Sequence, residues 1–378
     1  MTETDRILTT HAGSLPRPDD LAEMIWAGID GEPVDRGALD ERLDSAVAEI
    51  TAMQRAAGID ILSDGELSKS GFSTYIEERF SGFAGRSEFQ ADDVADFPNL
   101  AMRLFNTPSM AHVVFAKCVG PVALTDQQAV HADVDRLQRA LNGSDPSTAF
   151  MGAVSPGQIA FNYPNQHYGS HEEYLGALAD ALSYEYKAIT DAGFNLQVDS
   201  PDLAMAAHCR SVGSSVGDWH THVPLAIEAL NAALAGIPRE QVRLHVCWGN
   251  YGGPHHKDVP LKSIIGEVLK ANVGTIYPEG ANPRHEHEWR VFEELDLPDE
   301  MSIILGVIDV KSNCVEHPRV VADRLVRLAG VVGKERVLAG TDCGFDTFIR
   351  FSLVDPGVAW LKLHALAEGA QLASADLW

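Results

Sequence analysis

The chain has 378 residues, of which 45% are hydrophobic and 22% are charged, a composition typical of a globular protein with a substantial core. The 54 acidic residues outnumber the 29 basic ones and give a formal net charge of -25, which repels phosphate backbones and anionic lipid headgroups. We therefore expect neither a nucleic-acid partner nor a membrane partner.

The N-terminal segment and the cysteines indicate the compartment. MTETDRILTT lacks the apolar core of a signal peptide, and no run of about 18 apolar residues occurs along the chain, so we expect a cytoplasmic protein. The five cysteines are an odd number in a long chain, which argues against a disulfide framework and leaves thiols free to bind a metal. The sequence leaves homo-oligomerisation open.

Eight short apolar runs, each predicted to be a strand, alternate with amphipathic helices. In the helices over 39–58, 172–193 and 223–238, apolar residues recur every three or four positions, and each segment contains a glycine that can stop a helix. The predicted strands cover residues 6–14, 59–66, 149–157, 194–201, 242–250, 272–280, 302–309 and 336–344. This alternation predicts an α/β fold with a parallel sheet, and eight strands predict a closed (β/α)8 TIM barrel.

An open, doubly wound sheet is the alternative fold. The sequence has no GxGxxG at a strand-to-helix turn, so the usual dinucleotide site of that fold is missing and the barrel is favoured. We expect a single barrel domain over 1–378, with an insertion at about 67–146 between the second and third strands. That segment is too long for an ordinary loop of a compact domain.

Residues that ligate metals follow three of the predicted strands. In α/β barrels, reactive side chains collect at the C-terminal ends of the strands. Here these ends read HVC, YPEG and TDCG, and the first places its His and Cys two apart, on the same face of the strand. One imidazole, two thiolates and one carboxylate suit Zn²⁺. The four predicted ligands are His245, Cys247, Glu279 and Cys343.

The same residues have a structural explanation, which the sequence leaves open. His245 could be a core histidine, the cysteines inert thiols, and Glu279 a helix cap. If zinc binds, a catalytic role is favoured, because structural sites usually take their ligands from close pairs such as CxxC. Two thiolate ligands make zinc a weaker activator of water, whereas a substrate thiol can stay nucleophilic on it, so S-alkylation is the expected reaction.

Several motifs, in order along nearly the whole chain, resemble one family. They are ILTTHAGSLPRP, DILSDGE, LQVDSPDLA, HVCWGN, EGANPRHEHEW, GVIDVKSN and GTDCGF. Together they resemble the short, single-barrel relatives of cobalamin-independent methionine synthase, a group that includes epoxyalkane:coenzyme M transferase. The resemblance implies a barrel of the uroporphyrinogen decarboxylase/methionine synthase type, and a zinc held by the same four ligands that activates a thiol for attack on an alkyl donor.

The resemblance also implies substrate contacts. The segment TTHAGS, with His11 and Ser14, matches the part of methionine synthase that contacts the substrate carboxylate. Glu66 and Asp199 match the carboxylates that hold the substrate amino group. Arg17 is a further candidate, which could meet a substrate carboxylate or sulfonate.

Three residues are candidates for catalysis beyond the metal site. His255 and His256 lie on the loop after HVCWGN, where a general acid could protonate a leaving group. Lys311 stands near the position of a catalytic histidine of methionine synthase, and Asp199-Ser200-Pro201 replaces an Asp-Glu-Pro. These departures leave the thiol open, and also the donor, which could be a folate, a corrinoid, a methylated amine, a sulfonium or an epoxide.

We therefore expect a zinc-dependent transferase that moves a methyl or other alkyl group onto the thiol of a small molecule. An epoxide-opening thiol transferase and a zinc hydrolase are the main alternatives. A metal-free decarboxylase and a non-catalytic binding module are further ones.

Overall fold

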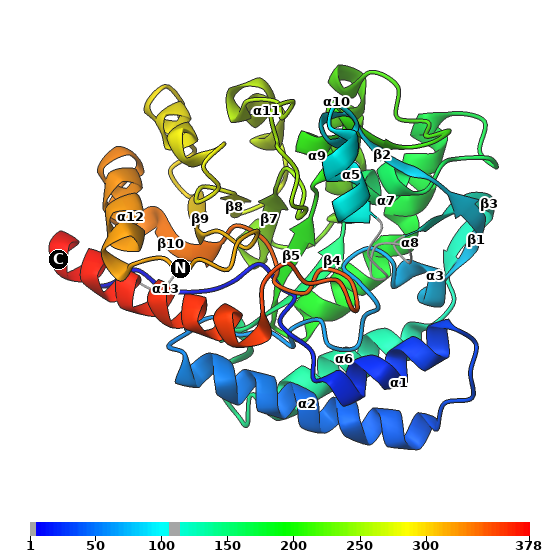
Figure 1. The fold of residues 1–378 in the computed structure, drawn as a ribbon, viewed down its shortest axis with the longest axis horizontal. Helices are drawn as coiled ribbons and strands as arrows, with labels where there is room; N and C mark the ends of the chain where they lie inside the picture. Colours follow the sequence, from blue (N-terminus) through cyan, green and yellow to red (C-terminus); the bar gives the residue numbers. More distant parts are fainter. Residues whose placement is uncertain (1–4, 106–113) are drawn as a thin grey trace.

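A computed structural model describes residues 5–105 and 114–378 and shows a barrel of parallel strands surrounded by helices (Figure 1). Within these residues, six strands form one sheet in the order β10-β9-β8-β7-β5-β4, and neighbouring strands run parallel. Most of their residues are buried, as expected for a sheet covered on both faces. The strands are β4 (Phe150–Val154), β5 (Asn195–Asp199), β7 (Val242–Val246), β8 (Thr275–Pro278), β9 (Ser302–Ile308) and β10 (Val337–Thr341).

Two short segments close the sheet between its edge strands β10 and β4. Thr9 pairs with Ala339 of β10, and Leu62 pairs with Ala149 just before β4, both in parallel. The two segments join each other, because the N–H groups of residues 60 and 61 donate to the carbonyl oxygen of Thr9 at 3.1 and 3.0 Å. The predicted α/β class and TIM barrel are confirmed.

The first two barrel segments are less regular than predicted. The ranges 6–14 and 59–66 form isolated bridges where we expected strands. A side chain replaces part of the backbone ladder, because Asp60 Oδ2 accepts from Thr9 N at 2.9 Å and from Thr9 Oγ1 at 3.0 Å.

The barrel helices form the outer layer, and their ends carry the predicted signals. For example, α8 begins where Ser170 Oγ accepts from Glu173 N at 3.1 Å, and ends before Gly193, whose φ of 89° favours glycine. No helix of the described chain is long and apolar enough to cross a bilayer. The outer helices are α2 (Arg36–Ala56), α6 (Gln127–Ala140), α8 (His171–Asp191), α10 (Trp219–Ala233), α11 (Leu261–Val268), α12 (Pro318–Val332) and α13 (Pro356–Leu377).

Shorter elements surround the barrel ends. β1 pairs with β3, and β2 with β6, both antiparallel. Helix α6 falls in the range 67–146 but packs against α2 and α8 in the outer layer, and the extent of the insertion stays a prediction. These shorter elements are α1 (Asp19–Ile29), α3 (Ile76–Arg79), β1 (Phe80–Ser87), β2 (Phe89–Ala91), α4 (Asp92–Ala95), α5 (Pro98–Phe105), β3 (Phe115–Leu124), η2 (Pro146–Thr148), α7 (Pro156–Asn162), α9 (Asp202–Met205), β6 (Cys209–Ser211), η3 (Arg239–Gln241), η4 (Glu286–Glu293) and η5 (Lys334–Arg336).

Candidate active site

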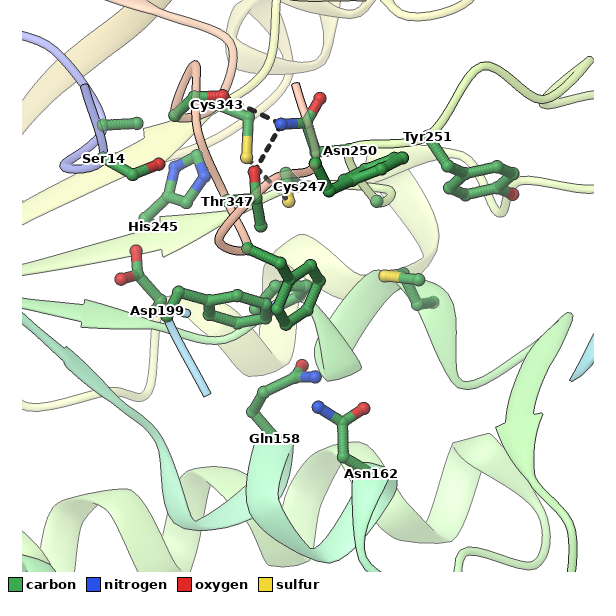
Figure 2. Close-up of a pocket in the computed structure, with 18 of the residues that line it drawn as sticks. Ser14, Gln158, Asn162, Asp199, His245, Cys247, Asn250, Tyr251, Cys343 and Thr347 are labelled. Atoms are coloured by element: carbon green, nitrogen blue, oxygen red, sulfur yellow. Dashed lines mark hydrogen bonds between the residues drawn. The ribbon is translucent and has the colours of Figure 1, made fainter. Parts of the chain in front are cut away.

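Three of the predicted metal ligands meet at the C-terminal ends of β7 and β10 (Figure 2). One ligand atom each of His245, Cys247 and Cys343 lies within 4.8 Å of the other two, and the two Sγ atoms are 4.0 Å apart. His245 Nδ1 lies 3.1 Å from the carbonyl oxygen of Tyr277, a contact that favours the tautomer with the proton on Nδ1.

The opposite nitrogen of His245 is the clearest sign that this group binds a metal. Its Nε2 atom is buried and has no hydrogen-bond partner among the described residues. A buried nitrogen with a free lone pair is costly unless a ligand occupies it. Two thiols and one such imidazole are donors that suit Zn²⁺, so the residues present fit this metal.

Glu279, the fourth predicted ligand, is paired with Lys311. It follows β8, and its two carboxylate oxygens lie 2.9 and 3.0 Å from Lys311 Nζ. It also accepts from Trp248 N at 3.3 Å. Both side chains of the pair are buried, with 0% of Glu279 and 9% of Lys311 exposed. The structure therefore brings three of the four predicted ligands together, whereas the fourth, Glu279, forms an ion pair with Lys311.

Asp342, next to Cys343, fixes the loop that carries Glu279. Its carboxylate accepts from the backbone N–H groups of Gly280, Ala281 and Asn282 at 2.9, 2.8 and 2.6 Å. Burial and the charge of Glu279 raise the pKa of Asp342 to about 7. This carboxylate thus ties the end of β8 to the end of β10.

Glu66 and Asp199 form a second group, of two buried carboxylates that face one space. A Cβ atom added to Gly152 of β4 would lie 2.9 Å from Glu66 Oε1 and 3.5 Å from Asp199 Oδ2. Burial and the charge of Asp199 raise the pKa of Glu66 to about 8, and burial raises that of Asp199 to about 6. Glu66 Oε2 is buried without a hydrogen-bond partner among the described residues. The pair would therefore be stabilised by a cation.

Both groups face one cavity with a volume of about 110 Å³. Ser14 also lines it, and Figure 2 shows this residue close to His245 and Cys343. A cavity that combines soft metal donors with buried carboxylates at the mouth of a barrel has the features of an enzyme active site.

The family follows from comparison with known proteins. The family model described as "Cobalamin-independent synthase, Catalytic domain" matches residues 159–352, just over half of the chain. The chain belongs to this family. It is 26% identical over 400 residues to a 2-hydroxypropyl-CoM lyase of Xanthobacter autotrophicus, covering 98% of this chain and 96% of that protein. It is 27% identical over 382 residues to a methionine synthase of Sulfurisphaera tokodaii, covering 100% and 95%.

A solved member of the family shares the fold. The structure of a B12-independent methionine synthase from Shewanella sp. W3-18-1, in complex with selenomethionine, superposes with a TM-score of 0.73 at 24% identity and covers 98% of this chain and 99% of that one. The predicted resemblance to this family is confirmed.

His11 and Arg17, two predicted substrate contacts, lie outside the cavity. His11 Nε2 bonds to Gln54 at 3.0 Å, and burial lowers the pKa of His11 to about 4. Arg17 Nη1 binds Asp346 at 2.7 Å, and its Nη2 donates to the carbonyl oxygen of Glu66 at 2.7 Å. Arg17 therefore positions the loop of Glu66, whereas the sequence suggested contact with an anionic substrate.

His255 and His256, the candidate general acids, also lie outside the cavity. His255 Nδ1 bonds to Asp258 Oδ2 at 2.9 Å, and the more exposed His256 bonds to Asp96 at 3.0 Å. The role of general acid stays a prediction for both.

The cavity also contains polar residues that the sequence interpretation missed. Asn250 Nδ2 donates to the carbonyl oxygen of Gly344 at 2.8 Å and to Thr347 Oγ1 at 2.5 Å, which links the loops after β7 and β10. Gln158 and Asn162 of α7 lie on the other side of the cavity from His245 (Figure 2). Gln158 follows a predicted strand and Asn250 ends HVCWGN. Both therefore lie at the C-terminal end of a predicted strand, where reactive side chains are expected.

A buried histidine supports the loop that follows Cys247. The ring of His285 stacks on Trp248 with centroids 3.8 Å apart. Its Nε2 bonds to Asp258 at 2.8 Å and its Nδ1 to Glu288 at 3.1 Å. Burial favours the neutral ring, but the two carboxylates outweigh burial and raise the pKa of His285 to about 9. The imidazolium form is therefore part of the folded state at neutral pH.

This imidazolium predicts a loss of stability at alkaline pH. Because the folded pKa of His285 lies above the ordinary value of about 6.5, its contribution is complete below pH 6.5 and is lost as the pH rises through 9. We expect the free energy of unfolding to fall by on the order of 3 kcal/mol over this window, and by much less in His285→Gln. Denaturant unfolding at pH 6 and pH 9.5 measures this, with the exposed His364→Gln as control. Equal pH dependence in wild type and His285→Gln would contradict it.

Proposed function

We propose that the chain is a zinc-dependent alkyltransferase that moves a methyl or other alkyl group onto the thiol of a small molecule. The observation that carries this proposal is the group of His245, Cys247 and Cys343, with its free imidazole nitrogen, beside a pair of buried carboxylates in one cavity. Relatives named methionine synthase and 2-hydroxypropyl-CoM lyase support chemistry at a thiol.

His245, Cys247 and Cys343 would hold the metal. Zinc, when bound, supplies the Lewis acidity that makes a thiol nucleophilic near neutral pH. The electron-rich sulfur donors disfavour the activation of water, which argues against the zinc hydrolase.

Glu66 and Asp199 would bind an ammonium group of the thiol substrate. Burial and, after it, the charge of Asp199 raise the pKa of Glu66, and one space lies within reach of both carboxylates. Charge-assisted hydrogen bonds to an ammonium would relieve this repulsion and orient the substrate. Ser14, at the metal end of the cavity, would offer its hydroxyl to the carboxylate of the same molecule.

Asp199→Asn is therefore expected to raise KM for an amine-bearing thiol by roughly 10- to 100-fold, the cost of losing one charged hydrogen-bond partner. For a thiol without an amine, KM should change little. Steady-state kinetics with homocysteine and with 2-mercaptoethanol measures the two effects. An equal increase in KM for both thiols would contradict an ammonium site at Asp199.

The function is tested by metal analysis and a screen of thiols against alkyl donors. Zinc-loaded protein is incubated with homocysteine, coenzyme M or glutathione, together with methyl donors or epoxides, and the loss of free thiol is followed. We expect thiol loss that depends on both the zinc and the donor. Hydrolysis of esters or amides without thiol, or full activity after chelation, would contradict the proposal. The relative named 2-hydroxypropyl-CoM lyase is the reason to include epoxides.

A further inference from the structure

Six phenylalanines line the cavity, and we call them the phenylalanine chamber. Five of the rings contact one another in a chain, with centroid distances of 5.5 Å for Phe72–Phe348, 6.3 Å for Phe348–Phe115, 6.0 Å for Phe115–Phe89 and 5.9 Å for Phe89–Phe161. Phe351 is the sixth and also lines the cavity.

The chamber is assembled from segments far apart in the sequence. Phe89 and Phe115 come from β2 and β3, Phe161 comes from α7, and Phe348 and Phe351 follow β10. Phe161 and Phe115 are buried, whereas Phe72, Phe89, Phe348 and Phe351 are only partly buried and keep ring surface accessible. Ring walls of this kind bind an apolar body, and they also attract a cation through their faces.

The charges around the chamber exclude one class of ligand. Among the residues that the structure describes, the cavity lining contains the carboxylates Glu66 and Asp199 but no Lys or Arg. The two cations that act on Glu66 are engaged elsewhere: Lys69 Nζ donates to the carbonyl oxygen of Gly152 at 2.7 Å, and Arg17 is paired with Asp346. An anionic group among these rings would therefore be desolvated without a Lys or Arg partner, in a cavity that two acids also line.

We propose that the phenylalanine chamber binds the alkyl donor, and that this donor has an apolar body without an anionic group, either neutral or cationic. This identification of the ligand as the donor rests on the proposed function. In the transfer, a C–S bond forms at the alkyl carbon while the bond to its leaving atom breaks. The leaving atom keeps the electron pair, and the thiol proton goes to solvent.

Three compounds with one phenylbutyl body separate the charge classes. They are 4-phenylbutan-1-ol, 4-phenylbutyltrimethylammonium and 5-phenylvalerate, titrated calorimetrically into the 378-residue protein. We expect the alcohol or the ammonium compound to bind at least ~10-fold more tightly than the carboxylate. Tighter binding of the ammonium indicates a cationic donor, and tighter binding of the alcohol a neutral one. Equal binding of the carboxylate, or no binding of any of the three, would overturn the proposal.

Variants place the binding in the chamber. Phe351→Ala should lower the affinity for the best-binding compound by about 10-fold, because it removes a partly exposed ring that would contact the ligand. Phe97→Ala removes a ring that is 48% exposed and lies outside the cavity, and should leave binding unchanged. Phe348→Leu is the second chamber variant if Phe351→Ala fails to fold. Equal changes in affinity for the chamber variants and the Phe97→Ala control would contradict binding in the chamber.

The outcomes also separate this inference from the proposed function. These titrations need neither zinc nor turnover. Binding of a probe without any thiol alkylation would therefore support the chamber as a binding site for non-anionic apolar ligands and contradict the proposed function. Thiol alkylation with an anionic donor, together with strong binding of 5-phenylvalerate, would support the proposed function and contradict the proposed ligand class of the chamber.

Discussion

Replacing Cys247 by Ser is expected to abolish zinc binding and thiol alkylation together. The thiol lies within 4.8 Å of the donor atoms of His245 and Cys343, and a serine hydroxyl is a poor ligand for zinc at neutral pH. Loss of a partner outside the ligand set typically costs roughly 10- to 100-fold in affinity or activity, so loss of a direct ligand should cost more than 100-fold in kcat/KM. Zinc content by mass spectrometry and kcat/KM for thiol loss measure the effect.

Cys314→Ser is the matched control for this substitution. Cys314 is an exposed free thiol away from the cavity, so its variant should keep full zinc content and turnover. Metal-free Cys247→Ser should still fold, with a melting temperature only moderately below that of the metal-free wild type, because serine fills nearly the same volume but adds one buried hydroxyl. Stoichiometric zinc and normal turnover in Cys247→Ser would remove the zinc assignment.

The barrel and most of the candidate site residues could be predicted because they depend on local patterns. Strands alternating with helices predict a parallel barrel, and such a barrel brings its strand ends to one mouth. This rule led to His245, Cys247 and Cys343, and the motifs led to Glu66 and Asp199, all of which line the cavity.

Other features depend on contacts between distant segments, which no local pattern encodes. Arg17 could be recognised as a cation near the site, but its pairing with Asp346, 329 positions away, decides its role. The same holds for the ring contact between Phe72 and Phe348 and for the pairing of Glu279 with Lys311. Sequence reasoning therefore named candidate donors that line the cavity, but not which of the candidates are paired with other side chains.

Lys311→Met should destabilise the metal-free protein by about 3–5 kcal/mol, because it leaves the charge of Glu279 buried without its cation. Both side chains are at most 9% exposed, whereas the pair of Lys262 and Glu294 is about two-thirds exposed. Lys262→Met is thus the matched control, with an expected loss below about 1 kcal/mol. Urea unfolding of both variants after chelation measures the difference, and equal losses would contradict a buried, charged Glu279.

Zinc should recover part of the stability that Lys311→Met loses, and this recovery would reveal the fourth ligand. Once Lys311 is gone, Glu279 is a buried anion that follows β8, the strand next to β7, which carries His245. A carboxylate completes the set of two thiolates and one imidazole that suits zinc. Unfolding of Lys311→Met with and without zinc, compared with Lys311→Met/Glu279→Gln, measures the gain. An equal gain from zinc in both variants would show that Glu279 takes no part in binding the metal.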